Sequence, residues 1–123
     1  MISNYSIGTD LVDVGRVRKL SEDHGERFLR RLFTGEEIGW CSRRAQPYIH
    51  LAGKFAAKEA VRKALMALGE SDSIPFNRIE IVREGGRHPT VRIHRTLPRS
   101  YNVEVSISHT DRLATAVALA HPT

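Results

Sequence analysis

Segments with the character of β-strands lie near both ends of the chain and in its second half. Five segments show alternating apolar and polar side chains or a high content of β-branched residues: residues 5–14, 79–82, 91–93, 103–108 and 114–119. A turn at Gly85-Gly86 is expected between the 79–82 and 91–93 segments. The last two segments are expected to form a hairpin around Thr110-Asp111-Arg112.

Three segments between these strands have the composition and spacing of helices: residues 15–32, about 35–43, and 48–68. The first is expected to be one or two short helices, broken near His24-Gly25. Thr34 followed by Glu37 is a capping-box pattern, and Pro47 and Gly69 suit the start and the end of the third helix. The order of strand, helices and then strands predicts an α+β fold.

Length and composition exclude several classes of protein. The 123 residues allow one domain, spanning 1–123, and 41% hydrophobic residues are enough for a core. The single cysteine, Cys41, excludes an intramolecular disulfide and a cysteine-based zinc site, and a buried inert thiol is expected there. No apolar run approaches the roughly 20 residues of a membrane span, and the N-terminus lacks the features of a signal peptide. We therefore expect a soluble cytoplasmic protein with no membrane partner.

The net charge of +5 favours a polyanionic partner. Nucleic acid, a phosphorylated small molecule and an acidic protein all fit that charge. The sequence has neither of the glycine-rich phosphate-binding signatures and no recognisable nucleic-acid reading motif, so a nucleic-acid binder is a rival supported by charge alone.

The predicted 48–68 helix has two faces of possible functional interest. Glu59 and Lys63 lie about 40° apart around the helix axis, so a carboxylate and an ammonium are neighbours. A basic stripe is expected beside them, made of Lys54, Lys58 and Arg62. A stripe of small residues on another side would allow a neighbouring backbone to approach closely: Ala56, Ala60, Ala64 and Ala67. Taken alone, the charged pair is more typical of a surface salt bridge and the stripe of a solvated face.

Two residues on predicted strands have both structural and functional interpretations. Asp10 is expected on the same face as Val12 and Val14, where a carboxylate is costly unless it is paired or metal-bound. Capping a helix or pairing with an arginine would explain it equally well. His109 is expected on the face of the apolar residues before it, and a lone histidine there is more often structural than a ligand.

Taken together, four segments resemble a single family. They are Ile7-Gly-Thr-Asp-Leu-Val12, Phe33-Thr34 followed by Glu37, the segment from Leu51 to Leu65 with its F-A-A-K-E-A core, and Val105-Ser-Ile-Ser-His-Thr110. These motifs, in this order and spacing over residues 6–119, resemble the holo-[acyl-carrier-protein] synthases, the small 4'-phosphopantetheinyl transferases. The resemblance implies an antiparallel sheet packed on a long helix. It also implies a homotrimer with active sites at the subunit interfaces.

The resemblance implies a reaction and a set of site residues. These enzymes transfer 4'-phosphopantetheine from coenzyme A to a serine of an apo acyl carrier protein, release adenosine 3',5'-bisphosphate and use magnesium. Asp10 and Glu59 would be the magnesium ligands, and Glu59 and Lys63 the catalytic residues, with Lys63 on the phosphates. The coenzyme A site would be lined by Lys54, Lys58, Lys63, His109 and Thr110. The base that takes the serine proton would be Glu59 or a metal-bound water.

The family also docks its acidic carrier protein on the first helix. Arg16 matches the docking arginine best, and Arg18, Lys19 and Arg27 are further candidates. The chain departs from the family pattern at Ser6, at Lys54, where arginine is common, and in the loop Met66–Glu70. The altered loop keeps open a non-catalytic module that binds coenzyme A or a carrier protein. The sequence names neither the carrier nor its pathway, which is fatty-acid synthesis or a specialised polyketide or peptide route.

Overall fold

The computed structural model describes residues 4–70, 73–84 and 86–123. Its elements in chain order are β1 (Ser6–Asp13), α1 (Val14–Leu32), α2 (Gly35–Ser42), α3 (Pro47–Ala67), the 3-10 turn η1 (Phe76–Arg78), β2 (Ile79–Val82), β3 (Thr90–Ile93), β4 (Tyr101–His109) and β5 (Leu113–Pro122). The five strands form one antiparallel sheet in the order β1-β5-β4-β3-β2. The α+β class predicted from the sequence is confirmed.

Local signals account for most element boundaries. Asp13 ends β1 and caps α1, because its carboxylate accepts a 3.0 Å hydrogen bond from the Arg16 backbone N–H. Val14 therefore belongs to α1, and the expectation that it continues the strand was wrong. The break in α1 falls at Gly25, whose φ of 63° only glycine adopts readily. Of the turn predicted at Gly85-Gly86, Gly85 lies outside the described residues, and Gly86 has a φ of 74°.

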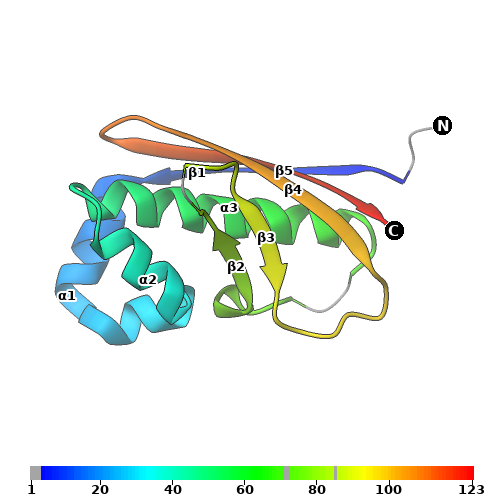
Figure 1. Cartoon of the computed structure of the whole chain (residues 1–123), viewed down its shortest axis with the longest axis horizontal. Coiled ribbons are helices and arrows are strands. Elements are labelled where there is room, and N and C mark those ends of the chain that lie inside the picture. The colour runs from blue at the N-terminus through cyan, green and yellow to red at the C-terminus, as the bar shows by residue number, and fades with distance from the viewer. Residues whose placement is uncertain (1–3, 71–72, 85) are drawn as a thin grey trace.

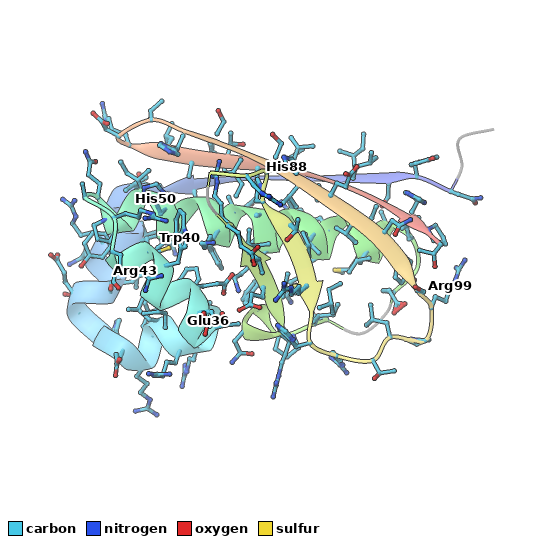
Figure 2. All side chains as sticks on the ribbon, viewed as in Figure 1. Glu36, Trp40, Arg43, His50, His88 and Arg99 are labelled. Atoms are coloured by element: carbon cyan, nitrogen blue, oxygen red, sulfur yellow. The ribbon has the colours of Figure 1, made fainter. Side chains whose placement is uncertain are left out.

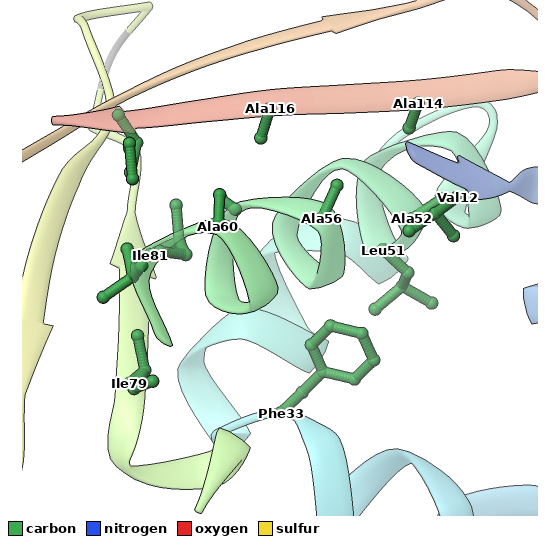
Figure 3. Close-up of a cluster of buried hydrophobic side chains, with 14 of the residues drawn as sticks. Val12, Phe33, Leu51, Ala52, Ala56, Ala60, Ile79, Ile81, Ala114 and Ala116 are labelled. Atoms are coloured by element: carbon green, nitrogen blue, oxygen red, sulfur yellow. The ribbon is translucent and has the colours of Figure 1, made fainter. Parts of the chain in front are cut away.

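Helix α3 lies directly under the long strands of the sheet, with α1 and α2 on its other side (Figure 1). Small side chains make this close packing possible. The inner face of β5 consists of alanines that are at most 1% exposed: Ala114, Ala116, Ala118 and Ala120. Figure 3 shows Ala114 and Ala116 directed at the alanines of α3. The small-residue stripe predicted on this helix does meet the sheet, except that Ala67 is exposed.

Helix α3 approaches β1 at the level of backbone atoms. A methyl group added at Gly8 would lie 1.9 Å from the Ala60 carbonyl oxygen, which is far inside van der Waals contact. One turn further along, the Ser6 hydroxyl donates a 2.6 Å hydrogen bond to the Ala64 carbonyl. Ser6, one of the departures from the family pattern, is therefore used to fasten β1 to the helix.

The β2–β3 hairpin diverges from the rest of the sheet (Figure 1). Within the described residues, a single residue pair, Thr90 with Glu104, joins β3 to β4. β2 is an edge strand, and side chains from α2 and α3 occupy its free edge. Glu37 accepts a 2.8 Å hydrogen bond from the Ile81 N–H, and Lys54 donates a 2.6 Å bond to the Ile81 carbonyl. The helices thus replace the neighbouring strand that β2 lacks.

A buried ion pair lies at the centre of these contacts. Lys58 is fully buried, with its ammonium 2.6 Å from the Glu37 carboxylate, and it also donates to the carbonyls of Phe76 and Ile79. Glu37 also accepts a 2.8 Å bond from the Thr34 N–H, which completes the predicted capping box. Burial lowers the pKa of Lys58, and the Glu37 carboxylate opposes that shift.

No helix within residues 4–70, 73–84 or 86–123 has the length and apolar character needed to cross a membrane.

Replacing Gly8 by alanine is expected to destabilise the fold by about 3 kcal/mol, because the new methyl group meets backbone that cannot move aside as a side chain could. The matched control is Gly35→Ala, at the start of α2, where no atom lies within 4 Å of the added methyl group. That change is expected to stay within about 0.5 kcal/mol. Urea unfolding at one fixed protein concentration measures both. Equal stabilities for the two variants would contradict the close approach.

Lys58→Met is expected to cost about 3–5 kcal/mol, because it leaves the buried Glu37 carboxylate without a cation. Adding Glu37→Gln removes that charge and keeps one acceptor, so the double variant is expected to be more stable than Lys58→Met alone. Lys19→Met, at an exposed pair with Asp23, is the control and is expected to cost under about 0.5 kcal/mol. A double variant less stable than Lys58→Met would show that an unpaired charge is not the cause.

Candidate active site

Asp10 and Lys63 come together at the β1 edge of the sheet. The Lys63 ammonium lies 3.4 Å from the Asp10 carboxylate and donates a 3.0 Å hydrogen bond to the Thr9 carbonyl. The Asp10 side chain is 20% exposed and that of Lys63 is 55% exposed. Asp10 is therefore paired, as its position required, but with a lysine of α3. The alternatives of an arginine partner and a helix cap are wrong.

Glu59 lies one turn before Lys63 on α3 and is half-buried. Residues four apart are neighbours on a helix surface, so Glu59 shares the flank of α3 on which Lys63 reaches β1. The adjacent residue, Ala60, is the one that contacts Gly8 of β1. The three residues predicted to carry the chemistry thus belong to one strand and one helix that are packed backbone to backbone.

The donor set at this edge suits a hard divalent cation. Among the described residues, no group of three or more His, Cys, Asp or Glu side chains comes together as a complete metal site. Magnesium does not require one, because it typically takes one or two carboxylates and completes its shell with water and ligand phosphates. The ammonium of Lys63 already occupies a cationic position beside Asp10. Asp10 and Glu59 supply carboxylates of the type that such a site would use.

Lys54 and Lys58 do not form the exposed basic stripe expected beside Glu59. Lys54 is 4% exposed and Lys58 is 0% exposed, and both ammonium groups are hydrogen-bonded to β2, η1 or Glu37. A direct contact between Lys58 and a cofactor is incompatible with this burial. The signal was present in the sequence, since these lysines continue the three-four spacing of a buried stripe with Leu51, Val61 and Leu65.

His109 and Thr110 lie at the end of β4. In the sheet this is the end at which β1 finishes, away from Ser6, where β1 begins. His109 is exposed, and its ring centroid is 5.8 Å from that of His50. The Thr110 hydroxyl oxygen accepts bonds of 3.2 and 3.1 Å from the N–H groups of Arg112 and Leu113, which hold the β4–β5 turn. A cleft of about 460 Å³ between this turn and the start of α1 is lined by Thr110 and Arg18, among others.

A cluster of aromatic and basic side chains near Lys54 was missed by the sequence analysis. The Arg44 guanidinium lies 3.8 Å and the Lys54 ammonium 4.7 Å from the Trp40 ring centroid. His50 packs edge-on against Trp40 with centroids 5.4 Å apart, and Figure 2 shows the two side by side. Arg83, which follows β2, lines the same small hollow as His50 and His109. No spacing along the chain could have indicated this cluster, because several elements contribute to it.

The four candidate docking residues on α1 are all exposed. Arg16, Arg18 and Lys19 precede the break at Gly25, and Arg27 follows it. Lys19 forms a 3.3 Å ion pair with Asp23, and the Arg18 guanidinium lies 5.2 Å from the Tyr48 ring centroid. All four side chains therefore lie on the surface of α1.

Cys41 does not serve this site. Its side chain is 0% exposed, and burial raises the pKa of its thiol to about 12. A thiol held protonated in the core is a poor nucleophile, which confirms the inert role expected from the sequence.

Comparison with known proteins gives a consistent result. The 4'-phosphopantetheinyl transferase superfamily matches residues 6–118. The chain is 41% identical over 122 residues to the holo-[acyl-carrier-protein] synthase of Chlamydia muridarum, which covers 97% of this chain and 96% of that protein. It is 38% identical over 120 residues to that of Leptospira biflexa, with coverages of 93% and 94%.

Solved structures show the same fold. A Chronobacterium ammoniagenes ACPS–CoA complex superposes with a TM-score of 0.81 at 26% identity, covering 97% of this chain and 98% of that one. The Bacillus anthracis holo-(acyl-carrier-protein) synthase in complex with CoA (3',5'-ADP) gives 0.77 at 27% identity, covering 96% of each chain. With motifs, fold and relatives in agreement, the chain belongs to the 4'-phosphopantetheinyl transferase superfamily.

Proposed function

We propose that this chain transfers 4'-phosphopantetheine from coenzyme A to a serine hydroxyl of an apo acyl carrier protein and releases adenosine 3',5'-bisphosphate. The observation that carries the proposal is the meeting of Asp10 and Lys63 at the β1 edge, with Glu59 one turn away. Relatives named holo-[acyl-carrier-protein] synthase, and solved complexes of such proteins with CoA, support the same reaction.

Asp10 and Glu59 are the residues that would hold a magnesium ion. When bound there, the ion supplies positive charge to offset the negative charge that develops on the leaving bisphosphate. Lys63 supplies a second positive charge. Its side chain is more than half exposed, so it is free to turn from Asp10 to a phosphate oxygen.

The incoming serine forms a bond to the phosphorus that carries the pantetheine arm. The bond from that phosphorus to the bisphosphate oxygen breaks, and the serine proton passes to a base. Among the described residues no ion pair involves Glu59, and we assign its carboxylate to accept the proton. Its half-buried position on a rigid helix suits a group that must keep its orientation.

The anionic end of coenzyme A would bind where Arg44, Lys54 and Arg83 lie close to the end of β4. We call this region the basic end of the sheet. Within the described ranges, no carboxylate forms an ion pair with Arg44, Lys54 or Arg83. These three groups offer the positive charge that a cofactor with several phosphates requires, and His109 lines the same hollow as Lys54 and Arg83. In this arrangement the Lys54 ammonium, which packs on the Trp40 ring, adds positive charge to the cofactor site. Lys58 stabilises the fold through Glu37 and does not contact the cofactor.

The acidic carrier protein would dock on α1. Arg16, Arg18, Lys19 and Arg27 are exposed there, and charge complementarity of this kind raises the rate of encounter and fixes orientation. The cleft that joins Arg18 to Thr110 makes this surface continuous with the end of β4. A carrier on α1 therefore lies close to the basic end of the sheet.

A homotrimer is the assembly that we propose. The outer face of β1 and β5 exposes large apolar side chains: Ile7 at 66%, Leu11 at 64%, Val117 at 45%, Leu113 at 43% and Leu119 at 38%. Ile7 pairs with Leu119 across the two strands, so the apolar surface is continuous. An apolar sheet face of this kind is typical of a protein interface, and in a closed trimer each copy would pack it against a different patch of the next copy.

The loop Met66–Glu70 gives little support to the non-catalytic alternative. Gly69, with a φ of 103°, ends α3, and the Glu70 carboxylate accepts a 2.9 Å hydrogen bond from the Tyr101 hydroxyl. This loop is anchored to the start of β4, and none of the contacts of Asp10 or Lys63 involves it. Its departure from the family pattern leaves the proposed chemical groups in place.

Glu59→Gln is expected to lower the transfer rate at least about 100-fold, because the amide neither accepts a proton nor binds a cation as a carboxylate does. Intact mass spectrometry of an acidic apo carrier protein, incubated with coenzyme A and magnesium, measures the gain of one phosphopantetheine. The wild-type chain is expected to produce it, and EDTA to abolish it. Glu36→Gln, at an exposed position on α2, is the matched control and is expected to retain full activity.

Near wild-type turnover by Glu59→Gln would overturn the assignment of that residue. A wild-type chain that binds coenzyme A but modifies none of several acidic carriers would instead establish the non-catalytic binding module.

Val117→Glu is expected to prevent assembly, because it places a charge in the middle of the apolar outer face. Size-exclusion chromatography with light scattering should give three times the chain mass for the wild-type protein and one chain mass for the variant. Ser42→Glu, at the exposed end of α2, adds the same charge elsewhere and is expected to remain a trimer. A monomeric wild-type protein at about 10 µM would contradict the proposed assembly.

A further inference from the structure

Three rings and a guanidinium form a continuous contact from α2 to the end of β4. Arg44 stacks on Trp40, Trp40 meets the edge of His50 at 5.4 Å, and His50 meets the edge of His109 at 5.8 Å. His50 is the middle of this series and belongs to the first turns of α3, next to the buried Leu51. Its ring is therefore held in place from both sides.

The four charged or titratable groups with the largest effect on His50 are all basic. The groups that act on it are His109 from β4, Arg44 from the segment after α2, Arg83 from the segment after β2 and Lys54 from α3 itself. Burial and these neighbours hold the pKa of His50 below its usual value of 6.5. Without a ligand, burial and these neighbours favour the neutral imidazole.

An anion placed in this cluster changes that balance. A phosphate beside His50 would offset the repulsion from the arginines and the lysine and would accept a hydrogen bond from a protonated imidazole. His109, which belongs to the proposed coenzyme A site, has its ring centroid 5.8 Å from that of His50. None of the motifs that relate this chain to its family includes position 50.

We infer that His50 is a specificity-determining residue that binds a phosphate group of coenzyme A as an imidazolium, so that cofactor binding takes up a proton. The inference rests on the proposed function, because it deepens the description of the same cofactor site. Coenzyme A offers two phosphate sources, the 3'-phosphate monoester and the pyrophosphate. Their shared chemistry, an anionic phosphoryl oxygen, is what the imidazolium recognises.

The direction of the pH dependence follows from linkage. Binding of an anion raises the pKa of His50, so the complex holds more protons than the free protein in the range in which the group titrates. Affinity due to His50 is therefore present at low pH and is lost as the pH rises through the pKa of the complex. The opposite dependence, tighter binding at high pH, is not compatible with this role.

The test is isothermal titration calorimetry of the full chain with coenzyme A, without carrier protein, at pH 6 and pH 8. The wild-type protein is compared with His50→Phe, which keeps a ring against Trp40. The variant is expected to bind about tenfold more weakly than wild type at pH 6, the size of one charge-assisted hydrogen bond, and nearly as well at pH 8. Titration in two buffers of different ionisation enthalpy is expected to show fewer protons taken up by the variant.

The variant His50→Lys separates charge from packing. The lysine ammonium does not titrate between pH 6 and pH 8. If positive charge at position 50 is what binds the phosphate, this variant is expected to bind coenzyme A tightly at both pH values. His24→Phe makes the same replacement as His50→Phe at an exposed position on α1, and it is expected to change neither affinity nor proton uptake. Melting temperatures of all variants establish that they are folded.

Repeating the titrations with 3'-dephospho-coenzyme A identifies the phosphate. A pH-dependent loss in His50→Phe for coenzyme A alone assigns the 3'-phosphate, and the same loss for both cofactors assigns the pyrophosphate. A loss that does not change with pH, or no loss with either cofactor, overturns the inference. Because the measurement is of binding, it stands apart from the transfer assay: a chain that shows the pH-linked effect but modifies no carrier would fail the proposed function alone.

Discussion

The buried ion pair between Lys58 and Glu37 holds together parts of the molecule that have few other contacts. It joins α3 to α2, and through the carbonyls of Phe76 and Ile79 it also fastens the β2–β3 hairpin. Successive residues of a helix point about 100° apart. With Lys58 fixed toward β2, the next residue, Glu59, is turned away from this network, on the flank where Lys63 meets Asp10. The structural lysine and the proposed catalytic glutamate therefore depend on the same orientation of one helix.

On the sheet side, the position of α3 is set by backbone contact. Gly8 lies against the Ala60 carbonyl, and Ser6 is hydrogen-bonded to that of Ala64. At Gly8 the distance between β1 and the helix is thus fixed by main-chain atoms, with no side-chain rotamer in between. Asp10, two residues beyond Gly8, is held at a constant height above the helix that carries its partner. A metal or phosphate at this edge would meet groups that are already in position.

The elements of the fold were predictable because their signals are local. Strand alternation, the Thr34–Glu37 capping box and the glycine break in α1 each involve residues a few positions apart. The candidate site could not be predicted from local signals. Helical periodicity alone is consistent with a surface salt bridge between Glu59 and Lys63, and only the resemblance to the family motifs assigned them a role. Lys54 and Lys58 were expected to be exposed because they are charged, although their spacing along α3 is that of the buried face. Trp40, His50 and Arg83 come together only through tertiary structure, so no local pattern marked them.

The alanines of β5 have a consequence for how the strand finds its place. In most sheets one face is apolar and the other polar, and this difference fixes the pairing register. β5 has alanine inward and large apolar side chains outward at Leu113, Val117 and Leu119, alongside the polar Thr115, so polarity distinguishes its two faces only weakly. Side-chain volume does so instead. A slip of one residue would direct leucine and valine at a helix whose backbone already touches the sheet, and there is no space for them. The pairing register of this strand is therefore selected by side-chain size, and the inward-facing alanines are the residues that determine it.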